Sequence, residues 1–255
     1  MTAALSVRAL DKRLGSTEVL CGLCLEVNTG ECLAVVGPNG AGKTTLFNLI
    51  SGRSVPTRGQ VFLHGRDITG LPPHAIHRLG LSRSFQLTQV FGRMTVEDNL
   101  RCASLAAKGR GTFLLGRIDR VRGVQARVED LLERLGLVGR RDTLAAELSY
   151  AEQRALELGL ALAGDPSVLL LDEPTAGMNR EESRQAVALI RALTRGRTLL
   201  VVEHDMGVVF ELADRVAVLD QGRLLALGSP DAVRTDPRVL RVYRGLNAEH
   251  PGAPC

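Results

Sequence analysis

Four short, almost entirely apolar runs constrain the fold of this 255-residue chain more than any other feature. They are ECLAVV (31–36), SVLLLD (167–172), TLLVVE (198–203) and RVAVLD (215–220). Runs of this length without polar alternation are typical of strands that are buried on both faces of a parallel sheet. Helical patterns near 180–195 and 206–213 separate the last three runs. The sequence therefore predicts an α/β fold with a mainly parallel sheet.

The N-terminal segments predict an antiparallel β region beside this sheet. LSVRAL (5–10) and the run around Val19–Val27 have strand character, and a turn is expected at Leu14-Gly15-Ser16 between them. Two more strands are expected at QVFLH (60–64) and LSRSFQ (81–86). Two helices are expected in the same part of the chain, one at KTTLFNLI (43–50), ended by Gly52, and a short one near 72–79.

The middle of the chain, residues 95–163, has almost no strand character. Apolar residues between 128 and 135 fall on one face of a helix that Gly136 ends, and 108–123 is expected to be a loop or hinge. This pattern predicts a helical insertion in the α/β core. The expected organisation is one domain over 1–246, with a core of about 1–86 and 164–246, a helical subdomain of about 87–163, and a flexible tail at 247–255.

Composition and charge exclude several classes of protein. Hydrophobic residues make up 45% and charged residues 24% of the chain, as in ordinary soluble globular proteins. The net charge of +4 comes from scattered basic residues, so no nucleic-acid partner is expected. No apolar run reaches the roughly 18 residues of a membrane helix, and the N-terminus lacks the pattern of a secretory signal. We expect the chain to stay in the cytosol.

The five cysteines agree with a cytosolic chain: Cys21, Cys24, Cys32, Cys102 and Cys255. The first two form a C-x-x-C pair, which occurs in metal and redox sites. No second Cys or His pair at ligand spacing follows, and VLCGLCLEV has the character of an apolar strand. We therefore predict buried, reduced thiols in preference to a metal or redox site.

A glycine-rich segment lies between the first apolar run and the following helix. GPNGAGKTT (37–45) matches the pattern G-x-x-x-x-G-K-[ST] in the strand, loop and helix context that this pattern needs. Its glycines allow backbone N–H groups to face phosphate oxygens, and the helix N-terminus adds its positive end. Lys43 can reach the β- and γ-phosphates, and the Thr44 hydroxyl can bind Mg²⁺. The residues expected to contact nucleotide are Gly37, Pro38, Asn39, Gly40, Ala41, Gly42, Lys43, Thr44 and Thr45.

Two acidic residues follow the second apolar run. Asp172, at the carboxyl end of a core strand beside the phosphate loop, is placed to hold Mg²⁺. Glu173 is expected to point the other way on the strand, where it can orient or deprotonate the water that attacks the γ-phosphate. An isolated Asp-Glu after a strand is usually a loop start, but beside a phosphate loop the magnesium interpretation is favoured.

Taken in order, these pieces resemble the ATP-binding subunits of ABC transporters over about residues 5–246. The resemblance rests on GPNGAGKTT, RSFQ with Gln86, LSYAEQR (148–154), VLLLDEP (168–174), AGMN (176–179) and VVEHDM with His204. It implies a P-loop NTPase core that hydrolyses ATP with Mg²⁺. By the same resemblance, Gln86 links Mg²⁺ and the attacking water to the helical region. His204 would contact the γ-phosphate and Glu173.

LSYAEQR corresponds to the family's signature turn, commonly LSGGQ. The resemblance implies that Ser149, Ala151 and Glu152 face the γ-phosphate bound by a second subunit, so that two chains complete two sites. AGMN would cross the dimer interface, with Asn179 where an Asp is common. Tyr150 and Glu152 are familiar variants, whereas Ala151 replaces a glycine. Its methyl group could crowd a phosphate or disfavour a positive φ, so we expect weakened but retained closure.

Leu14 is a second departure from the family pattern. The family usually stacks an aromatic ring on adenine some two dozen residues before the phosphate loop, and KRLGS puts Leu14 in that place. A leucine can cover one face of the base without π-stacking, which leaves nucleotide selectivity open.

Other segments resemble one group within the family, the ATPases of branched-chain amino acid importers, with urea and short-amide importers close behind. These segments are FGRMTVEDNL (91–100), AGMN with the following REES, VVEHDMGVVF, and GSPDAVRTDPRVLRVYRG (228–245). The resemblance implies two integral membrane permease subunits, a second ATP-binding subunit that is identical or different, and an external solute-binding protein. It also implies a peripheral location on the cytoplasmic face of the membrane.

Three alternatives remain. A lipopolysaccharide-exporting ATPase has similar sequences around the same motifs. A soluble ABC protein acting on ribosomes or DNA usually carries two cassettes, a coiled coil or zinc modules, and none of these is found here. A non-hydrolysing binding subunit is opposed by Glu173 and His204.

Overall fold

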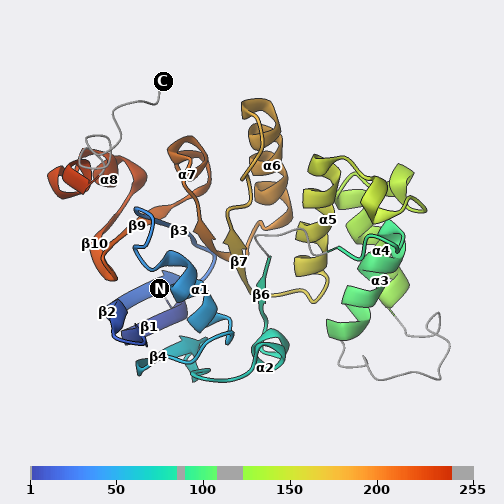
Figure 1. Ribbon diagram of the computed structural model, residues 1–255. Coiled ribbons are helices and arrows are strands. Elements are labelled where there is room, and N and C mark those ends of the chain that lie inside the picture. The colour runs from blue at the N-terminus through green and yellow to red at the C-terminus, as the bar shows by residue number, and fades with distance from the viewer. Residues whose placement is uncertain (1, 85–89, 108–122, 243–255) are drawn as a thin grey trace. The chain divides into compact units, whose positions relative to one another are not determined.

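The computed structural model describes residues 2–84, 90–107 and 123–242. The chain forms two compact units, residues 1–73 with 198–255 and residues 74–197, each with its own strands and helices (Figure 1). Gln86, nearly all of the expected 108–123 loop and the 247–255 tail lie outside the described residues. The predicted division into a core and a helical subdomain stays a prediction.

The antiparallel β region predicted near the N-terminus belongs to the first unit. Its strands are β1 (Ala3–Leu14), β2 (Thr17–Asn28), β4 (Arg58–Leu63) and β5 (Arg66–Asp67), in the spatial order β2-β1-β4-β5. The first two form a hairpin in which Leu14 pairs with Thr17, and Gly15 supplies the positive φ of 61° at the expected turn. Both strands run longer than predicted because hairpin pairing continues beyond the apolar core, from Lys12 to Leu14 on β1 and back to Thr17 on β2.

The remaining strands of the first unit are mostly parallel. They are β3 (Cys32–Val36), β8 (Thr198–Val202), β9 (Arg215–Asp220) and β10 (Arg223–Gly228). β3 pairs in parallel with β8 and with β9, and β10 is antiparallel to β9. All five residues of β3 and of β8 are buried, as expected for strands covered on both faces. The sequence analysis missed β10, whose burial is uneven.

The helices of the first unit include α1 (Lys43–Ile50), α7 (Met206–Leu212) and α8 (Pro230–Thr235). The first two were expected within a residue or so. Val208 and Val209 of α7 are buried, and Val209 packs with Ala34 of β3 and with Val216 and Val218 of β9 in one apolar cluster. This cluster holds α7 against the parallel strands.

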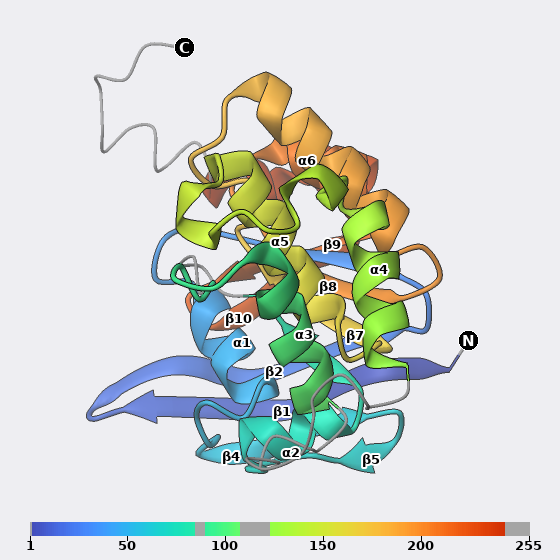
Figure 2. The ribbon, with the colours of Figure 1, turned by 90° about the vertical axis from the view of Figure 1, so that its right-hand side faces the viewer.

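The second unit contains the predicted helical region. Its elements are α2 (Pro73–Arg78), β6 (Leu81–Arg83), α3 (Val96–Ala107), α4 (Val124–Arg134), the 3-10 turns η2 (Val138–Arg140) and η3 (Ala145–Glu147), α5 (Tyr150–Leu162), β7 (Val168–Asp172) and α6 (Arg180–Leu193). β6 and β7 pair in parallel. α3 packs against α4 and α5 (Figure 2). Gly159 of α5 allows a close approach, because a Cβ there would lie 2.5 Å from Leu135 and 3.0 Å from Leu100.

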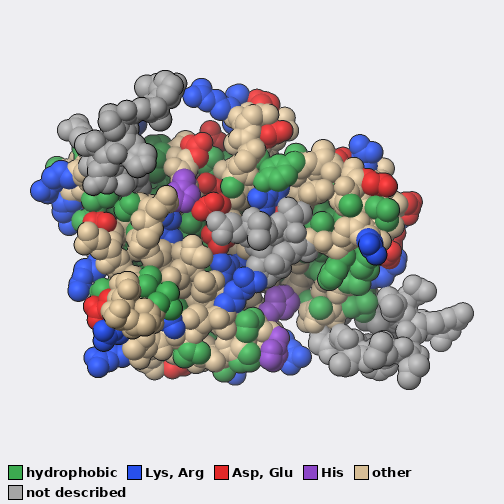
Figure 3. Space-filling view, in the orientation of Figure 1, with side chains coloured by type: hydrophobic (Ala, Val, Ile, Leu, Met, Phe, Trp, Pro, Cys, Tyr) green, Lys and Arg blue, Asp and Glu red, His purple; other side chains and the backbone are tan. Residues whose placement is uncertain are grey.

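Surface features bear on the sequence expectations about cysteines, charge and membrane helices. Cys21 of the C-x-x-C pair is half-buried and Cys24 is exposed, so the pair is less buried than predicted. Cys32 is buried, Cys102 is exposed, and none of the four described cysteines forms a disulfide. Cys24 is exposed because it alternates with the buried Leu23 and Leu25 along β2, an edge strand. Basic and acidic side chains are mixed over the face drawn in Figure 3. No described helix is both long and apolar enough to cross a membrane.

Gly59 provides a test of the β1–β4 packing. It has φ +85°, and a Cβ there would lie 2.3 Å from the carbonyl oxygen of Ala9 and 2.6 Å from that of Arg8, at a register shift in β1. Because backbone strain and overlap add, we expect Gly59→Ala to lower the free energy of unfolding by about 3 kcal/mol. Gly65→Ala is the control, since φ is +77° but no atom lies within 4 Å. It should cost about 1 kcal/mol. Equal costs in urea unfolding would contradict the packing argument.

Candidate nucleotide-binding site

The phosphate loop connects β3 to α1 in the first unit, as predicted. Gly37, Gly40 and Gly42 have positive φ angles of 152°, 79° and 100°. A Cβ at Gly37 would lie 2.2 Å from the carbonyl oxygen of Leu219, and one at Gly42 would lie 2.6 Å from Leu20 Cδ2. At Gly40 no atom lies within 4 Å. The loop is therefore held closely against β9 and β2 at two points and is open at Gly40.

The N-terminus of α1 is arranged to receive an anion. Among the described residues, no side chain caps the helix at Gly42, and its first turn carries no acidic residue. The positive end of the helix dipole therefore faces the phosphate loop without an acidic side chain to offset it. Thr44 is exposed on this turn and Thr45 is half-buried.

Lys43 lies beneath the same loop. Its ammonium group donates hydrogen bonds to the carbonyl oxygens of Gly37 at 2.7 Å and Pro38 at 2.9 Å. Its buried position puts a positive charge at the base of the loop. Asn39 and Gly40 are exposed, whereas Ala41 is buried and packs inward.

His204 and Leu14 also lie in the first unit. His204 follows β8 and is exposed, and its backbone N–H donates to the carboxylate of Glu203 at 3.1 Å. Asp205 then caps α7 by accepting a 2.7 Å hydrogen bond from the N–H of Gly207, which fixes the turn that carries His204. Leu14 is exposed at the end of the β1–β2 hairpin.

Asp172 ends β7 in the second unit, and its side chain is only 1% exposed. Its Oδ2 accepts a 2.6 Å hydrogen bond from the guanidinium of Arg83, whose side chain is 7% exposed on the neighbouring strand β6. Among the described residues its Oδ1 has no hydrogen-bond partner. A buried carboxylate oxygen in this condition fits a Mg²⁺ ligand, because hard cations prefer such oxygens. The sequence analysis did not identify Arg83 as the partner of Asp172. A charged residue within a short predicted strand could have indicated a buried ion pair.

Glu173 departs from the predicted geometry. It lies beyond the end of β7 with a φ of 50°, so its side-chain direction is set by a left-handed backbone and not by strand alternation. Such conformations cost about 1–3 kcal/mol for residues other than glycine, and they concentrate at functional sites. The predicted catalytic acid therefore occupies a strained position.

The signature turn forms a complete capping box at the start of α5. Ser149 Oγ accepts from the N–H of Glu152 at 3.3 Å, and Glu152 Oε2 accepts from the N–H of Ser149 at 2.8 Å. Arg140 donates to the other oxygen of Glu152 at 2.9 Å. These contacts, the backbone hydrogen bond from Ser149 first, lower the pKa of Glu152. The carboxylate is therefore held in its ionised form at the helix N-terminus.

Ala151 lies within the first turn of α5 and has an ordinary helical backbone. The backbone has no positive φ at this position, so crowding of a phosphate is the remaining effect considered for the methyl group. Its methyl group is exposed. Whether that group crowds a phosphate stays a prediction.

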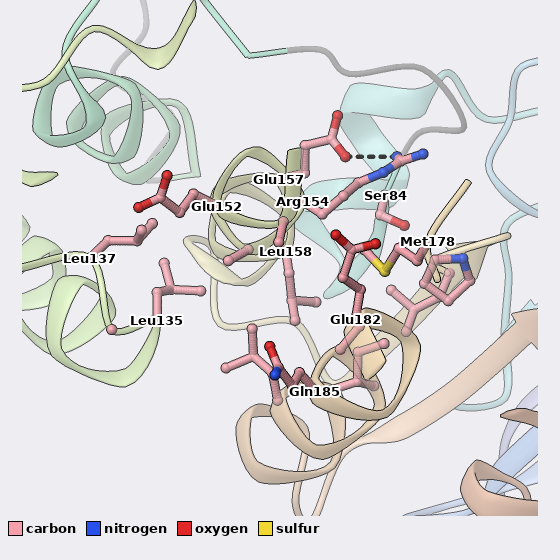
Figure 4. A pocket seen from close by; sticks show the side chains of 18 of the residues that line it. Ser84, Leu135, Leu137, Glu152, Arg154, Glu157, Leu158, Met178, Glu182 and Gln185 are labelled. Atoms are coloured by element: carbon pink, nitrogen blue, oxygen red, sulfur yellow. Dashed lines mark hydrogen bonds and ion pairs between the residues drawn. The ribbon is translucent and has the colours of Figure 1, made fainter. Parts of the chain in front are cut away.

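A cavity of about 240 Å³ lies between α5 and α6 in the second unit (Figure 4). Leu135, Leu158 and Met178 contribute apolar walls, and Figure 4 shows Glu182 and Gln185 projecting from α6. Ala151 also lines it. The cavity thus adjoins the start of α5.

The structure gathers the predicted residues into two sets. The phosphate loop, Leu14 and His204 lie in the first unit. The second unit contains Asp172, Glu173, Ser149, Ala151, Glu152 and Asn179. Asn179 caps α6 with hydrogen bonds from the N–H groups of Glu181 and Glu182 at 2.9 and 3.0 Å.

Comparison with known proteins places this geometry in context. A sequence profile described as ABC transporter matches residues 20–176. The chain is 38% identical to the high-affinity branched-chain amino acid transport ATP-binding protein LivG of Salmonella typhimurium, over 94% of this chain and 97% of that protein. It is 37% identical to the lipopolysaccharide export system ATP-binding protein LptB of Acidithiobacillus ferridurans, over 96% and 98%. A crystal structure of the ADP conformation of an ATP-binding cassette of an ABC transporter matches with a TM-score of 0.83 and 28% identity, over 96% and 100%.

The buried Arg83–Asp172 pair makes a testable contribution to stability. Arg83→Gln leaves the Asp172 carboxylate buried without its ion-pair partner, so we expect the free energy of unfolding in EDTA to fall by about 3–5 kcal/mol. Combining it with Asp172→Asn should recover much of that loss. The control is Arg184→Gln, which breaks an exposed pair with Glu181 and should cost less than about 0.5 kcal/mol. Similar costs for the two single variants in chemical denaturation would refute the role of burial.

Proposed function

This chain belongs to the ABC transporter family, and we propose that it is the ATP-binding and hydrolysing subunit that energises an importer of branched-chain amino acids. The observation that carries the ATP-binding part of the proposal is the phosphate loop, in which positive-φ glycines, an uncapped helix start and Lys43 meet. The chain is an ATP hydrolase of the ABC type.

Roles for the residues follow from their chemistry. Residues 37–45 bind the phosphates through backbone N–H groups, and the ammonium of Lys43 offsets their charge. Asp172 and Thr44 would hold Mg²⁺, with Gln86 as a further ligand. Mg²⁺, when bound, would neutralise charge on the β- and γ-phosphates. Leu14 covers one face of the adenine.

Hydrolysis requires a group that accepts a proton from water. Glu173 takes this role, because a carboxylate can accept a proton from water. Its left-handed backbone, with a φ of 50°, is of the strained kind that concentrates at functional sites. His204, exposed after β8, contacts the γ-phosphate and orients the water with Glu173. The two residues lie in different units, so their cooperation is part of the proposal.

The signature turn acts on the nucleotide of a second ATP-binding subunit, identical or different. Ser149 accepts the cap hydrogen bond with its oxygen, so its hydroxyl hydrogen is available to donate to a phosphate. The ionic contact from Arg140 offsets the charge of Glu152 near that phosphate. Two chains, related by two-fold symmetry if they are identical, would thereby complete two sites.

The transport assignment is supported by LivG and by the segments that resemble importer ATPases. In this proposal the chain lies on the cytoplasmic face of the membrane, against two permease subunits, and an external binding protein delivers the solute. Urea or short amides are alternative solutes. Lipopolysaccharide export is the second candidate, favoured by the 37% identity to LptB.

An uptake experiment tests the solute and the catalytic acid together. Deleting the gene in its host should abolish high-affinity leucine uptake, and the wild-type chain should restore it. Glu173→Gln should fail to restore it, because ATP turnover without the base should fall by about 100-fold or more. Glu211→Gln, at an exposed carboxylate on α7, is the matched control and should restore uptake. Normal leucine uptake with a lipopolysaccharide defect would favour the exporter instead.

Ala151→Gly tests the methyl group of the signature turn. If the methyl crowds the partner's phosphate, glycine should raise ATP turnover by up to about tenfold, equivalent to about 1.4 kcal/mol. Ala188→Gly, at an exposed position on α6, controls for the helix cost of glycine and should leave turnover unchanged. Unchanged turnover in Ala151→Gly would show that the methyl is harmless.

A further inference from the structure

Tyr150 uses the whole hydrogen-bonding capacity of its hydroxyl although it lies near the surface. The hydroxyl donates to the carbonyl oxygen of Ala176 at 2.7 Å, and it accepts from Nε and Nη2 of Arg154 at 3.1 and 2.9 Å. A phenolic oxygen can donate one hydrogen and accept two. The guanidinium also lies over the ring, 5.2 Å from its centroid. The position of this side chain is therefore strongly determined.

Arg154 is held in turn by Glu157. Their side chains are 11% and 8% exposed and meet at 2.9 Å, as the dashed line in Figure 4 shows. A buried ion pair contributes little net stability, because desolvation offsets the attraction, but it fixes geometry through charge-assisted hydrogen bonds. The pair thus orients the guanidinium that orients Tyr150.

Ala176 lies in the middle of the loop 173–179, whose ends are anchored separately. Asp172 before the loop binds Arg83, and Asn179 at its end caps α6. Within the loop the N–H of Ala176 donates to the carbonyl oxygen of Glu173 at 3.1 Å. Ala176 therefore joins the hydroxyl of Tyr150 to the backbone of Glu173 through two successive hydrogen bonds.

We propose that Tyr150 is a positioning residue, which ties the loop 173–179 and its first residue, Glu173, to the signature turn of the same chain. The inference rests on the proposed function, in which Ser149 faces the partner's nucleotide and Glu173 acts on the chain's own. A displacement of the signature turn on contact with the partner then reaches the Glu173 backbone through Ala176. A glycine at position 150 could not make this connection, because it has no side chain.

Tyr150→Phe tests the tie, since it removes the hydroxyl and keeps the ring under Arg154. In hydrogen–deuterium exchange on the full chain without nucleotide, the amides of Ala176 and Met178 should exchange about tenfold faster, because the loop has lost its central hydrogen bond. In ATP hydrolysis, kcat should fall by about tenfold while KM changes less than about twofold, since the phosphate loop is untouched. A purely structural helix contact would not separate kcat from KM.

Arg154→Gln should reproduce the faster exchange, and the double variant with Tyr150→Phe should be no worse than either single one, because both act on one connection. Phe210→Leu is the control, since that exposed ring in the first unit also lies under an arginine, Arg234. It should change neither readout.

Three outcomes separate the inference from the proposed function. Unchanged exchange in Tyr150→Phe would overturn the tie, and faster exchange with unchanged kcat would overturn the positioning role. A wild-type chain that does not hydrolyse ATP would contradict the proposed function, whereas the exchange measurement without nucleotide would still support or overturn the tie.

Discussion

Strands that are buried on both faces leave only their ends for chemistry, and this constraint organises both units. β3, β7 and β8 have no exposed residue along their length. The phosphate loop follows β3. Asp172 is the last residue of β7 and Glu173 comes directly after it, and His204 lies just beyond β8. Polar groups are costly inside such strands, so each strand presents its reactive residues where the backbone leaves the sheet.

Three charged groups of the candidate site have partners within the chain. Lys43 bonds to carbonyl oxygens of its own loop, Asp172 to Arg83, and Glu152 to Arg140. Such contacts hold side chains near their working positions, so less conformational freedom is lost when a ligand arrives. They also set a cost, because a nucleotide must compete for the ammonium of Lys43. The internal contacts thus order the side chains before binding, and a bound phosphate replaces part of the hydrogen bonding of Lys43.

The sequence predicted the element types and the phosphate loop well, because these depend on local patterns of apolar residues and glycine. It did not predict the Arg83–Asp172 pair, which depends on the register between β6 and β7. It placed Glu173 on a strand, although the chain leaves β7 in a left-handed conformation there. It also predicted that Cys24 is buried. A run of apolar residues does not show whether a strand lies at the edge of its sheet, as β2 does. Nor did the sequence show that Ala151 lies in the first turn of α5, where the backbone has no positive φ.

The two exposed thiols have a practical consequence. Cys24 lies on β2 of the first unit and Cys102 on α3 of the second, so the native sequence already carries one accessible attachment point on each. With Cys21 and Cys255 replaced, a pair of fluorophores or spin labels could be attached to these two sulfurs. The distance between the two labels during a catalytic cycle would report the separation of the units, without any engineered cysteine.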